Sequence, residues 1–254
     1  MKIIKYFFEF ISIISLFCIF KIIGLKNASN LGSLLGRFIG PLFRSKKIIK
    51  QNIKIGLGNL DEKKEKEIIN GMWSNIGRTF AEYIFLKDFK FNKTNFDHIK
   101  INGTNYLNEI KTTNKPVVFF SCHLANFELM AMELDKFGIK CAAIYRPLNN
   151  FFLNPLMEYL RMKYICPTQI PKGRMGMREI ISRIKDGYSI ALMMDQRVSE
   201  GQKVPFFNKP AFTTTIPAQL ALKYNCKLVP ISLERKEGPN FEMTIHEPYR
   251  IEKT

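Results

Sequence analysis

The composition of this 254-residue chain restricts its class before any motif is considered. Its hydrophobic fraction of 46% is ample for a core, and its length allows one large or two small domains. The five cysteines are scattered and show no paired CxxC spacing, which argues against a disulfide framework or a zinc site and favours a reducing compartment. The net charge of +17 leaves three kinds of partner open: nucleic acid, an anionic membrane and an anionic substrate.

The first strongly apolar segment covers residues 3–25. Its uninterrupted stretch, between Glu9 and Lys21, has eleven residues and is short for spanning a bilayer. Lys5, Glu9 and Lys21 lie near the ends, where long side chains can reach the membrane interface. No small-residue cleavage site of the signal-peptide kind is present. We therefore expect residues 1–25 to be a membrane anchor, spanning or half-inserted, with a hydrophobic helix packed on the domain as the alternative.

Positive charge is dense after this segment. Basic residues that follow a membrane segment favour the cytoplasmic side of an inner membrane and contact with anionic lipids. We expect the rest of the chain to face the cytoplasm, with an anionic membrane as a partner. The basic residues of this region are Lys26, Arg37, Arg44, Lys46, Lys47, Lys50 and Lys54.

Residues 26–95 are expected to form a helical part. Apolar residues recur at helical spacing, and Asp61 is placed to cap the helix that carries Trp73 and Phe80. Trp73 is interpreted as a core residue. Glu82 lies inside an apolar stretch, and the sequence assigns it no function.

From residue 96 to 254 the pattern changes to strands that alternate with helices. Such alternation predicts an α/β fold with a mostly parallel central sheet flanked by helices. Together with the helical part, this region is expected to form a single domain, 26–254. The predicted strands are 117–122, 139–145, 189–194, 227–233 and 241–246, and the predicted helices are 126–137, 154–164, 175–186 and 215–224.

A candidate catalytic pair follows the strand at 117–122. His123 comes directly after the strand, and Glu128 lies five residues later, where the next helix begins. Ligands bind at the carboxyl ends of strands in open α/β sheets. Residues five apart on one helix point about 140° away from each other, so we expect His123 in the turn and Glu128 in the first helical turn. Glu128 then accepts a hydrogen bond from one imidazole nitrogen, and the other nitrogen serves as general base.

This spacing also has a simpler explanation. With three histidines and 22 acidic residues in the chain, such a pair arises readily by composition alone. Its place between a strand and a helix favours the functional interpretation. Cys122 is adjacent, but neighbours that leave a strand point to opposite sides, so we do not expect a cysteine nucleophile. His123 and Glu128 alone are too few ligands for zinc, and no metal is expected.

Polar residues follow the next two predicted strands as well. Arg146 and Asn149 come after one, and Asp195 and Gln196 come after the other. Between them, Arg174 lies in a glycine-containing basic loop that opens a helix. Arginines and helix-start amides suit a phosphate there, and solvated loop charges are the alternative.

Five segments occur in the order known from one family. They are His-Leu-Ala-Asn-Phe-Glu (123–128), Tyr-Arg-Pro-Leu-Asn-Asn (145–150), Met-Asp-Gln (194–196), Val-Pro-Phe-Phe-Asn-Lys-Pro-Ala (204–211) and Val-Pro-Ile (229–231). Over most of its length the chain resembles the lipid A biosynthesis (Kdo-dependent lauroyl/myristoyl) acyltransferases. These belong to the glycerolipid acyltransferase superfamily, which shares a His-x4-Asp/Glu motif. One such motif is weak evidence, but five in order are strong.

The resemblance implies a membrane-bound O-acyltransferase without a cofactor. The donor would be acyl carrier protein with a fatty acyl thioester, and the acceptor a hydroxyl of a lipid A precursor. His123 matches the catalytic base and Glu128 its acidic partner. Arg146 is implied to lie near a phosphate of the acceptor, and Asp195 and Gln196 in the acceptor site. The full predicted substrate-binding set is Asn126, Arg146, Asn149, Arg174, Asp195 and Gln196.

Two further features of the sequence are compared with this family, the segment 201–213 and the C-terminal end. The apolar segment 201–213 is expected to be a loop that lines an acyl-chain pocket or covers the sheet. The family usually has a further C-terminal helix with Trp, His and Arg residues, whereas this sequence ends at Thr254.

Two alternatives stay open. The first keeps acyl transfer but changes the acceptor to glycerophosphate, a lysophospholipid or another glycolipid. The second is a non-catalytic basic protein that binds membranes or nucleic acid, motivated by the charge of +17. The sequence has no compact Lys/Arg cluster with interleaved aromatics, so nucleic acid is not an expected partner.

Overall fold

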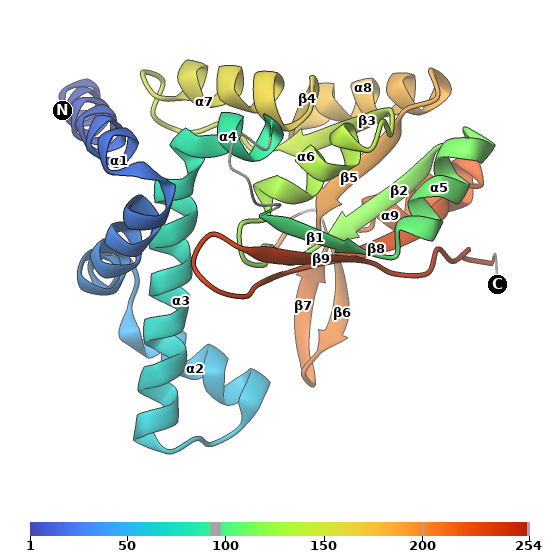
Figure 1. The fold of residues 1–254 in the computed structure, drawn as a ribbon. Helices are drawn as coiled ribbons and strands as arrows, with labels where there is room; N and C mark the ends of the chain where they lie inside the picture. The colour runs from blue at the N-terminus through green and yellow to red at the C-terminus, as the bar shows by residue number, and fades with distance from the viewer. Residues whose placement is uncertain (92–97, 200, 253–254) are drawn as a thin grey trace.

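The computed structural model describes residues 1–91, 98–199 and 201–252, and it has an α/β fold. A layered sheet region makes up most of the molecule, and the N-terminal helices are gathered beside it, at the left in Figure 1. The boundary expected at residues 95 and 96 lies outside the described residues. The anchor and domain limits therefore stay predictions.

The central sheet has seven strands in the order β1-β9-β8-β2-β5-β3-β4. Every neighbouring pair is parallel except β8 with β9, which confirms the predicted mostly parallel sheet. All five predicted strands are present, whereas β1 and β4 were missed because each is only four residues long. The strands are β1 (Ile99–Asn102), β2 (Val117–Ser121), β3 (Cys141–Tyr145), β4 (Thr168–Pro171), β5 (Ser189–Met193), β8 (Lys227–Arg235) and β9 (Phe241–Ile245).

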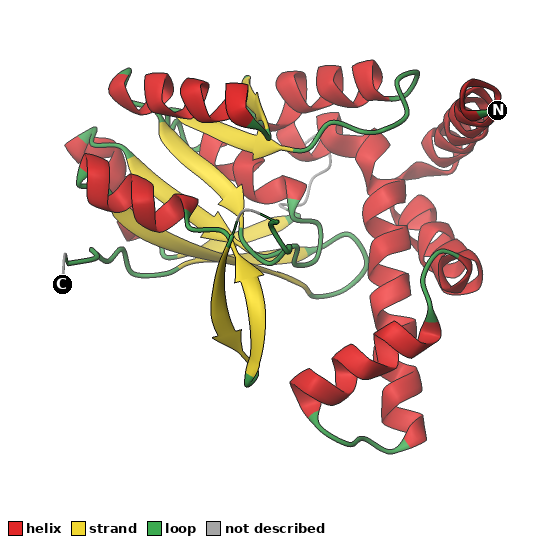
Figure 2. Cartoon of the chain, turned by 180° about the vertical axis from the view of Figure 1, so that it is seen from behind, coloured by secondary structure: helices red, strands yellow, loops and turns green. Residues whose placement is uncertain are grey.

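Helices cover both faces of this sheet (Figures 1 and 2). Strand β2 shows why, because its alternating side chains enter two separate cores. Phe119 packs in the core that contains α5 and α6, and Val118 packs in the core that contains α8 and α9. The helices are α1 (Lys2–Ile39), α2 (Lys46–Leu57), α3 (Glu62–Glu82), α4 (Leu86–Phe91), α5 (Thr104–Thr113), α6 (Glu128–Lys136), α7 (Asn154–Leu160), α8 (Arg174–Lys185) and α9 (Ile216–Tyr224), with 3-10 turns at Gly40–Leu42 and Tyr83–Phe85 and a π-helical turn at Arg161–Ile165.

The N-terminal helices pack through glycines. A Cβ at Gly32 of α1 would lie 2.4 Å from the carbonyl oxygen of Gly77 on α3, so only glycine allows this approach. Asp61 caps α3 as predicted, because its carboxylate accepts the backbone N–H of Lys64 at 2.8 Å. Helix α1 kinks at Gly24, where φ is 79°. Its N-terminal part is apolar and largely exposed, and the helix is long and apolar enough to cross a membrane.

The segment 201–213 is not the loop that we expected. It forms an antiparallel hairpin of β6 (Gln202–Phe206) and β7 (Lys209–Thr213), which projects away from the central sheet (Figure 1). The turn residues Phe207 and Asn208 have φ values of 48° and 57°, as a two-residue hairpin turn requires. The loop prediction failed because this turn lacks the usual glycine and both strands contain proline.

Candidate active site

A cavity of about 470 Å³ lies at the carboxyl ends of β2, β3 and β5. This volume is in the usual range for small-ligand sites, which are mostly apolar with a few polar groups. One part of its lining is apolar and comes from α6, β3 and the π-helical turn, with Met130, Ala131, Leu134, Ala143 and Ile165. The other part is polar and carries His123, Glu128, Arg146, Arg161, Lys172 and Gln196.

His123 occupies the turn after β2, and Asp195, two residues after β5, holds it. The imidazole Nδ1 lies 2.7 Å from Asp195 Oδ1, and the backbone N–H of His123 donates to Asp195 Oδ2 at 3.0 Å. Strands β2 and β5 are hydrogen-bonded neighbours, and Phe120 and Ser121 pair with Leu192 and Met193, so their polar ends meet. A carboxylate at Nδ1 places the proton on that nitrogen and leaves the Nε2 lone pair free to act as a base.

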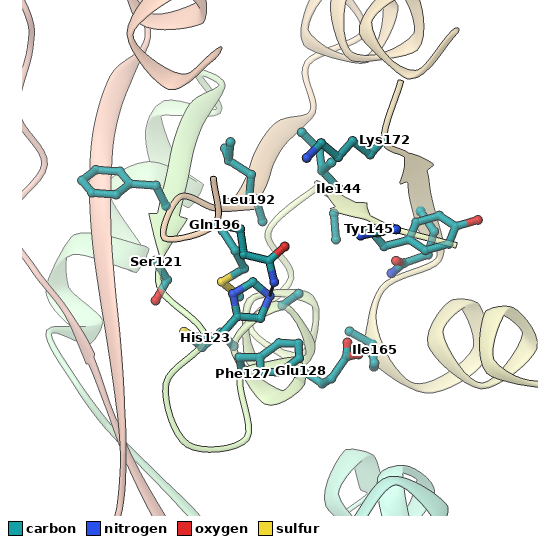
Figure 3. A pocket seen from close by; sticks show the side chains of 18 of the residues that line it. Ser121, His123, Phe127, Glu128, Ile144, Tyr145, Ile165, Lys172, Leu192 and Gln196 are labelled. Carbon is teal, nitrogen blue, oxygen red and sulfur yellow. Dashed lines mark hydrogen bonds between the residues drawn. The ribbon is translucent and has the colours of Figure 1, made fainter. Parts of the chain in front are cut away.

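The Nε2 atom of His123 is directed toward polar and aromatic neighbours in the cavity. Gln196 Nε2 lies 3.3 Å from it, and the ring of Phe127 packs edge-on at a centroid distance of 4.6 Å. Figure 3 shows the Gln196 amide next to the His123 ring, with Phe127 beneath it. The amide N–H of Gln196 donates to Nε2 here, so it occupies the position of any group that would give a proton to this nitrogen.

Glu128 does not contact His123, which corrects the expected hydrogen bond between them. It is the first residue of α6, as expected, but Ala125 in the preceding turn has φ of 46°, and the carboxylate is directed toward Ile165 (Figure 3). There Glu128 Oε1 accepts from Arg161 Nη2 at 2.6 Å and from Arg161 Nε at 3.1 Å. Local spacing could place Glu128 in the first turn but could not identify Arg161 as its partner.

The Glu128–Arg161 pair is largely buried, with side chains 11% and 12% exposed, and it has a third member. Tyr83 donates its hydroxyl proton to Glu128 Oε1 at 3.3 Å, and burial, together with the Glu128 charge, raises the pKa of Tyr83 well above its usual value. Burial by itself lowers the pKa of Arg161, but Glu128 and Tyr83 outweigh this effect and the net pKa is raised. Arg161 Nη1 is buried without a hydrogen-bond partner among the described residues. The site therefore holds a cation whose Nη1 amino group has no hydrogen-bond partner among the described residues.

The comparison with protein families shows the family of the chain. The family model of the bacterial lipid A biosynthesis acyltransferases matches residues 1–254. The chain belongs to this family. It is an enzyme that transfers acyl groups, which confirms the resemblance seen in the sequence. Among curated proteins the comparison found no match.

The six residues predicted to bind substrate are divided by the structure. Arg146, Asn149 and Gln196 line the cavity of the acyltransferase. Asp195 is engaged with His123, and Arg174, the exposed first residue of α8, does not occur among the described lining residues. The π-helical turn instead contributes Arg161, which the sequence analysis missed. The loop before α8 contributes Lys172, which begins the predicted basic loop but was not in the predicted substrate-binding set.

Asn126 also differs from the prediction. Its side chain is 1% exposed and donates through Nδ2 to Glu82 Oε2 at 3.0 Å. It is absent from the cavity lining in the part of the chain that the structure describes. Asn126 is therefore a buried structural partner of Glu82.

Little in the sequence pattern indicates that Arg161 is a site residue. Arg161 lies within the helix predicted at 154–164, next to the apolar residues of that helix. An arginine in this position is ordinary and does not indicate a site. The structure changes this helix to a π-helical turn at Arg161–Ile165, and such turns occur frequently at functional sites. A pattern of period 3.6 cannot predict that change.

The cysteine next to His123 has the properties of a poor nucleophile. Cys122 is exposed, but partial burial and the Asp195 charge raise the pKa of its thiol. The thiolate, which is the reactive form, is therefore a small fraction near neutral pH. Among the described residues, no group of three or more His, Cys, Asp or Glu side chains is placed to hold a metal ion.

Proposed function

We propose that this acyltransferase moves a fatty acyl chain from an acyl carrier protein thioester to a hydroxyl of a lipid A precursor, with His123 as general base. One observation carries the proposal. His123 is held by Asp195 through Nδ1 at 2.7 Å, and it lines a cavity with an apolar wall and a basic rim. Asp195 takes the orienting role that the sequence assigned to Glu128.

The reaction follows from this arrangement. The acceptor hydroxyl replaces the Gln196 amide at His123 Nε2, and its oxygen attacks the thioester carbonyl carbon as Nε2 takes the proton. A tetrahedral intermediate forms, and its collapse breaks the carbon–sulfur bond. The leaving thiolate receives the proton from His123. Asp195 stabilises the imidazolium between the two steps, as the aspartate does in a hydrolase triad.

Negative charge develops on the thioester oxygen during this attack, and a donor in a water-poor site stabilises it best. Arg161 is the candidate, because the residue lines the cavity and its Nη1 has no partner among the described residues. Nη1 is buried in the free protein, so the thioester has to displace the groups that cover it. Glu128 supports this role through two hydrogen bonds that orient the guanidinium plane. Glu128 thus serves the reaction through Arg161.

The two parts of the cavity match the two substrates. The apolar wall of Met130, Ala131 and Leu134 suits an acyl chain, because its burial is driven by the hydrophobic effect. Arg146 and Lys172 are cations in the polar part of the lining and suit the phosphate groups of an acceptor glycolipid. A net charge of +17 favours the approach of an anionic carrier protein and an anionic membrane.

The location proposed for the enzyme is the inner membrane, with the sheet region facing the cytoplasm. Helix α1 supplies the anchor, since Ile3, Phe8 and Ile22 are 64%, 64% and 84% exposed to solvent in the isolated chain. Basic residues follow the kink at Gly24, which supports a cytoplasmic position for the remainder. Labelling of single cysteines introduced on α8, in intact and in opened cells, tests this orientation.

The test of the function is transfer of a labelled acyl chain from acyl carrier protein to a lipid A precursor by the full chain in membranes. We expect His123→Ala to reduce the initial rate at least a hundredfold. His246→Ala is the matched control, because this histidine binds Ser232 Oγ at 2.9 Å and does not line the cavity. If His123→Ala keeps more than about a tenth of the rate, general-base catalysis at this site is wrong.

Acceptor identity is decided in the same assay. Glycerophosphate, a lysophospholipid and the lipid A precursor are offered separately at equal concentration. Transfer to the lipid A precursor alone supports the proposal, and preferential transfer to another acceptor would contradict it. Lack of transfer to any lipid would contradict acyl transfer by this chain.

A further inference from the structure

Glu82, the last residue of α3, connects four parts of the protein. Its side chain is 0% exposed. Oε1 accepts from Ser29 Oγ of α1 at 2.8 Å and from Arg235 Nη1 of β8. Oε2 accepts from Arg235 Nη2 at 3.0 Å and from Asn126 Nδ2, in the turn after β2, also at 3.0 Å. One buried carboxylate thus holds α1, α3, β8 and the turn that contains His123.

Stability alone does not require such a network. Apolar residues of similar volume often replace a buried ion pair without loss of stability, because the ions lose their hydration on burial. A buried carboxylate with hydrogen bonds to both of its oxygens instead favours a single arrangement of the parts that it joins. One of the parts that Glu82 joins is therefore expected to need a single fixed arrangement.

The turn after β2 is the part that needs support. Ala125 has φ of 46°, which is unfavourable for a residue with a Cβ. Its carbonyl oxygen accepts from Asn75 Nδ2 at 3.0 Å and from Thr79 Oγ1 at 3.1 Å. Asn75, Thr79 and Glu82 recur at helical spacing and share one face of α3. Helix α3 thus presents three polar side chains to two consecutive residues of the turn.

His123 and Glu128 lie on either side of the two turn residues that α3 holds. His123 lies two residues before Ala125, and Glu128 lies two residues after Asn126. Asn126 Oδ1 is buried and has no partner among the described residues, so the hydrogen bond to Glu82 is what orients this side chain. A displacement of the turn would move His123 and Glu128 together.

We propose that Glu82 is a positioning residue for acyl transfer. Through Asn126 it holds the turn that aims His123 at the acceptor hydroxyl and Glu128 at Arg161. This inference rests on the proposed function, and it assigns a role to a residue that does not touch the cavity. Glu82 should therefore affect turnover more than substrate binding.

Two single substitutions separate positioning from stability. Asn126→Ala removes the link to the turn but keeps Arg235 and Ser29 on the carboxylate. Ser29→Ala is the matched control, because it removes one hydrogen bond to the same carboxylate on the α1 side, together with the bond that Ser29 Oγ accepts from Arg78 Nη1 at 2.9 Å. We expect Asn126→Ala to lower kcat at least tenfold with KM changed less than threefold, whereas Ser29→Ala stays within twofold of the parent chain. Both variants should show comparable losses in Tm.

A second measurement does not depend on activity. Hydrogen exchange of the backbone amides at 122–128 should become faster in Asn126→Ala and stay unchanged in Ser29→Ala. If the parent chain transfers no acyl group, the proposed function fails, and the exchange result still decides whether Glu82 holds the turn.

Glu82→Gln provides a second variant of nearly equal volume. It should lower kcat, because the amide has one acceptor oxygen where the carboxylate has two, and so it weakens the hold on Arg235 and Asn126 together. The loss in the double variant should be smaller than the product of the two single losses, because Glu82 and Asn126 act through one contact. The proposal is overturned if Asn126→Ala keeps kcat within twofold, or if Ser29→Ala lowers kcat equally. If neither Asn126→Ala nor Glu82→Gln folds, the network serves stability, and the positioning role is rejected.

Discussion

Asp195 holds His123 at two points, with one carboxylate oxygen at the imidazole Nδ1 and the other at the backbone N–H of the same residue. The side chain and the main chain of the proposed base are therefore oriented by one carboxylate. In the proposed mechanism this relationship, rather than a bond from Glu128, orients the general base. It also makes Asp195 the first residue to test after His123.

We predict that Asp195→Asn lowers kcat by roughly two to four orders of magnitude. The amide cannot stabilise an imidazolium, and in hydrolase triads the same change costs about four orders. The variant should fold, because Asp195 is about one-third exposed. The measurement is the initial rate at saturating acceptor, with circular dichroism to confirm the fold. The double variant with His123→Ala should be scarcely worse than His123→Ala, and multiplicative losses would show that the two residues act separately.

Glu128 and Arg161 should contribute to the free energy of unfolding as a coupled pair. Removal of one partner leaves a buried charge unpaired and typically costs about 3–5 kcal/mol. We expect Glu128→Gln to lower the free energy of unfolding, and Glu128→Gln with Arg161→Gln to lower it less than either single substitution does. Urea unfolding of the enzyme in detergent measures these values. Additive losses in the double variant would contradict a direct pair.

Arg161→Lys tests the proposed role of the guanidinium in the reaction. A lysine keeps the charge but cannot form the two hydrogen bonds that Nε and Nη2 donate to Glu128 Oε1, so its orientation is lost. We predict at least a tenfold loss in kcat with the fold retained. Arg183→Lys on α8 is the control, because its partner Glu179 is on the same exposed helix face. A similar rate for Arg161→Lys and the parent enzyme would remove Arg161 from the reaction.

The apolar wall should set the acyl chain length. Ala131 lines the cavity, and Ala131→Leu fills part of it. We expect the preferred acyl chain to become shorter, since longer chains lose room and overpacking costs about 1–3 kcal/mol. Competition among acyl carrier proteins with different chain lengths measures the preference. Ala218→Leu on α9, outside the cavity lining, should leave it unchanged. An unchanged preference in Ala131→Leu would place the acyl chain elsewhere.

Cys122 should be dispensable. Because its pKa is raised, its thiolate fraction at a given pH is smaller than that of an ordinary thiol, and alkylation by iodoacetamide at pH 8 should be slower than for a small-molecule thiol. Cys122→Ala should keep kcat within about threefold. Loss of activity in Cys122→Ala with an intact fold would reopen a covalent mechanism.

Two glycines of the helical part should respond to alanine in opposite ways. Gly32→Ala would place a Cβ 2.4 Å from the Gly77 carbonyl oxygen, so we expect a loss of about 1–3 kcal/mol as α1 and α3 move apart. Gly71 on α3 has open space around its Cβ position, and Gly71→Ala should stabilise the helix by roughly 0.5–1 kcal/mol. Thermal unfolding in one detergent compares the two, and equal shifts in Tm would contradict the close packing of these helices.

The sequence by itself determined the elements that depend on neighbouring residues. The apolar run before His123, the stripe of α6 and the Asp61 cap of α3 are local patterns, and each was placed within about two residues. The parallel sheet followed from the alternation of strands and helices. His123 was found because a histidine at the end of a buried strand is visible without any knowledge of the neighbouring strand.

The tertiary structure decided the partners. His123 and Asp195 are 72 positions apart and meet because β5 lies beside β2 in the sheet, an order that depends on packing across both faces. The partners of Glu82 come from Ser29, Asn126 and Arg235, which no local pattern connects. The sequence placed Glu128 five residues after His123 and so predicted a pair. The left-handed turn at Ala125 directs this carboxylate to Arg161, because hydrogen bonds from α3 offset the local strain of that turn.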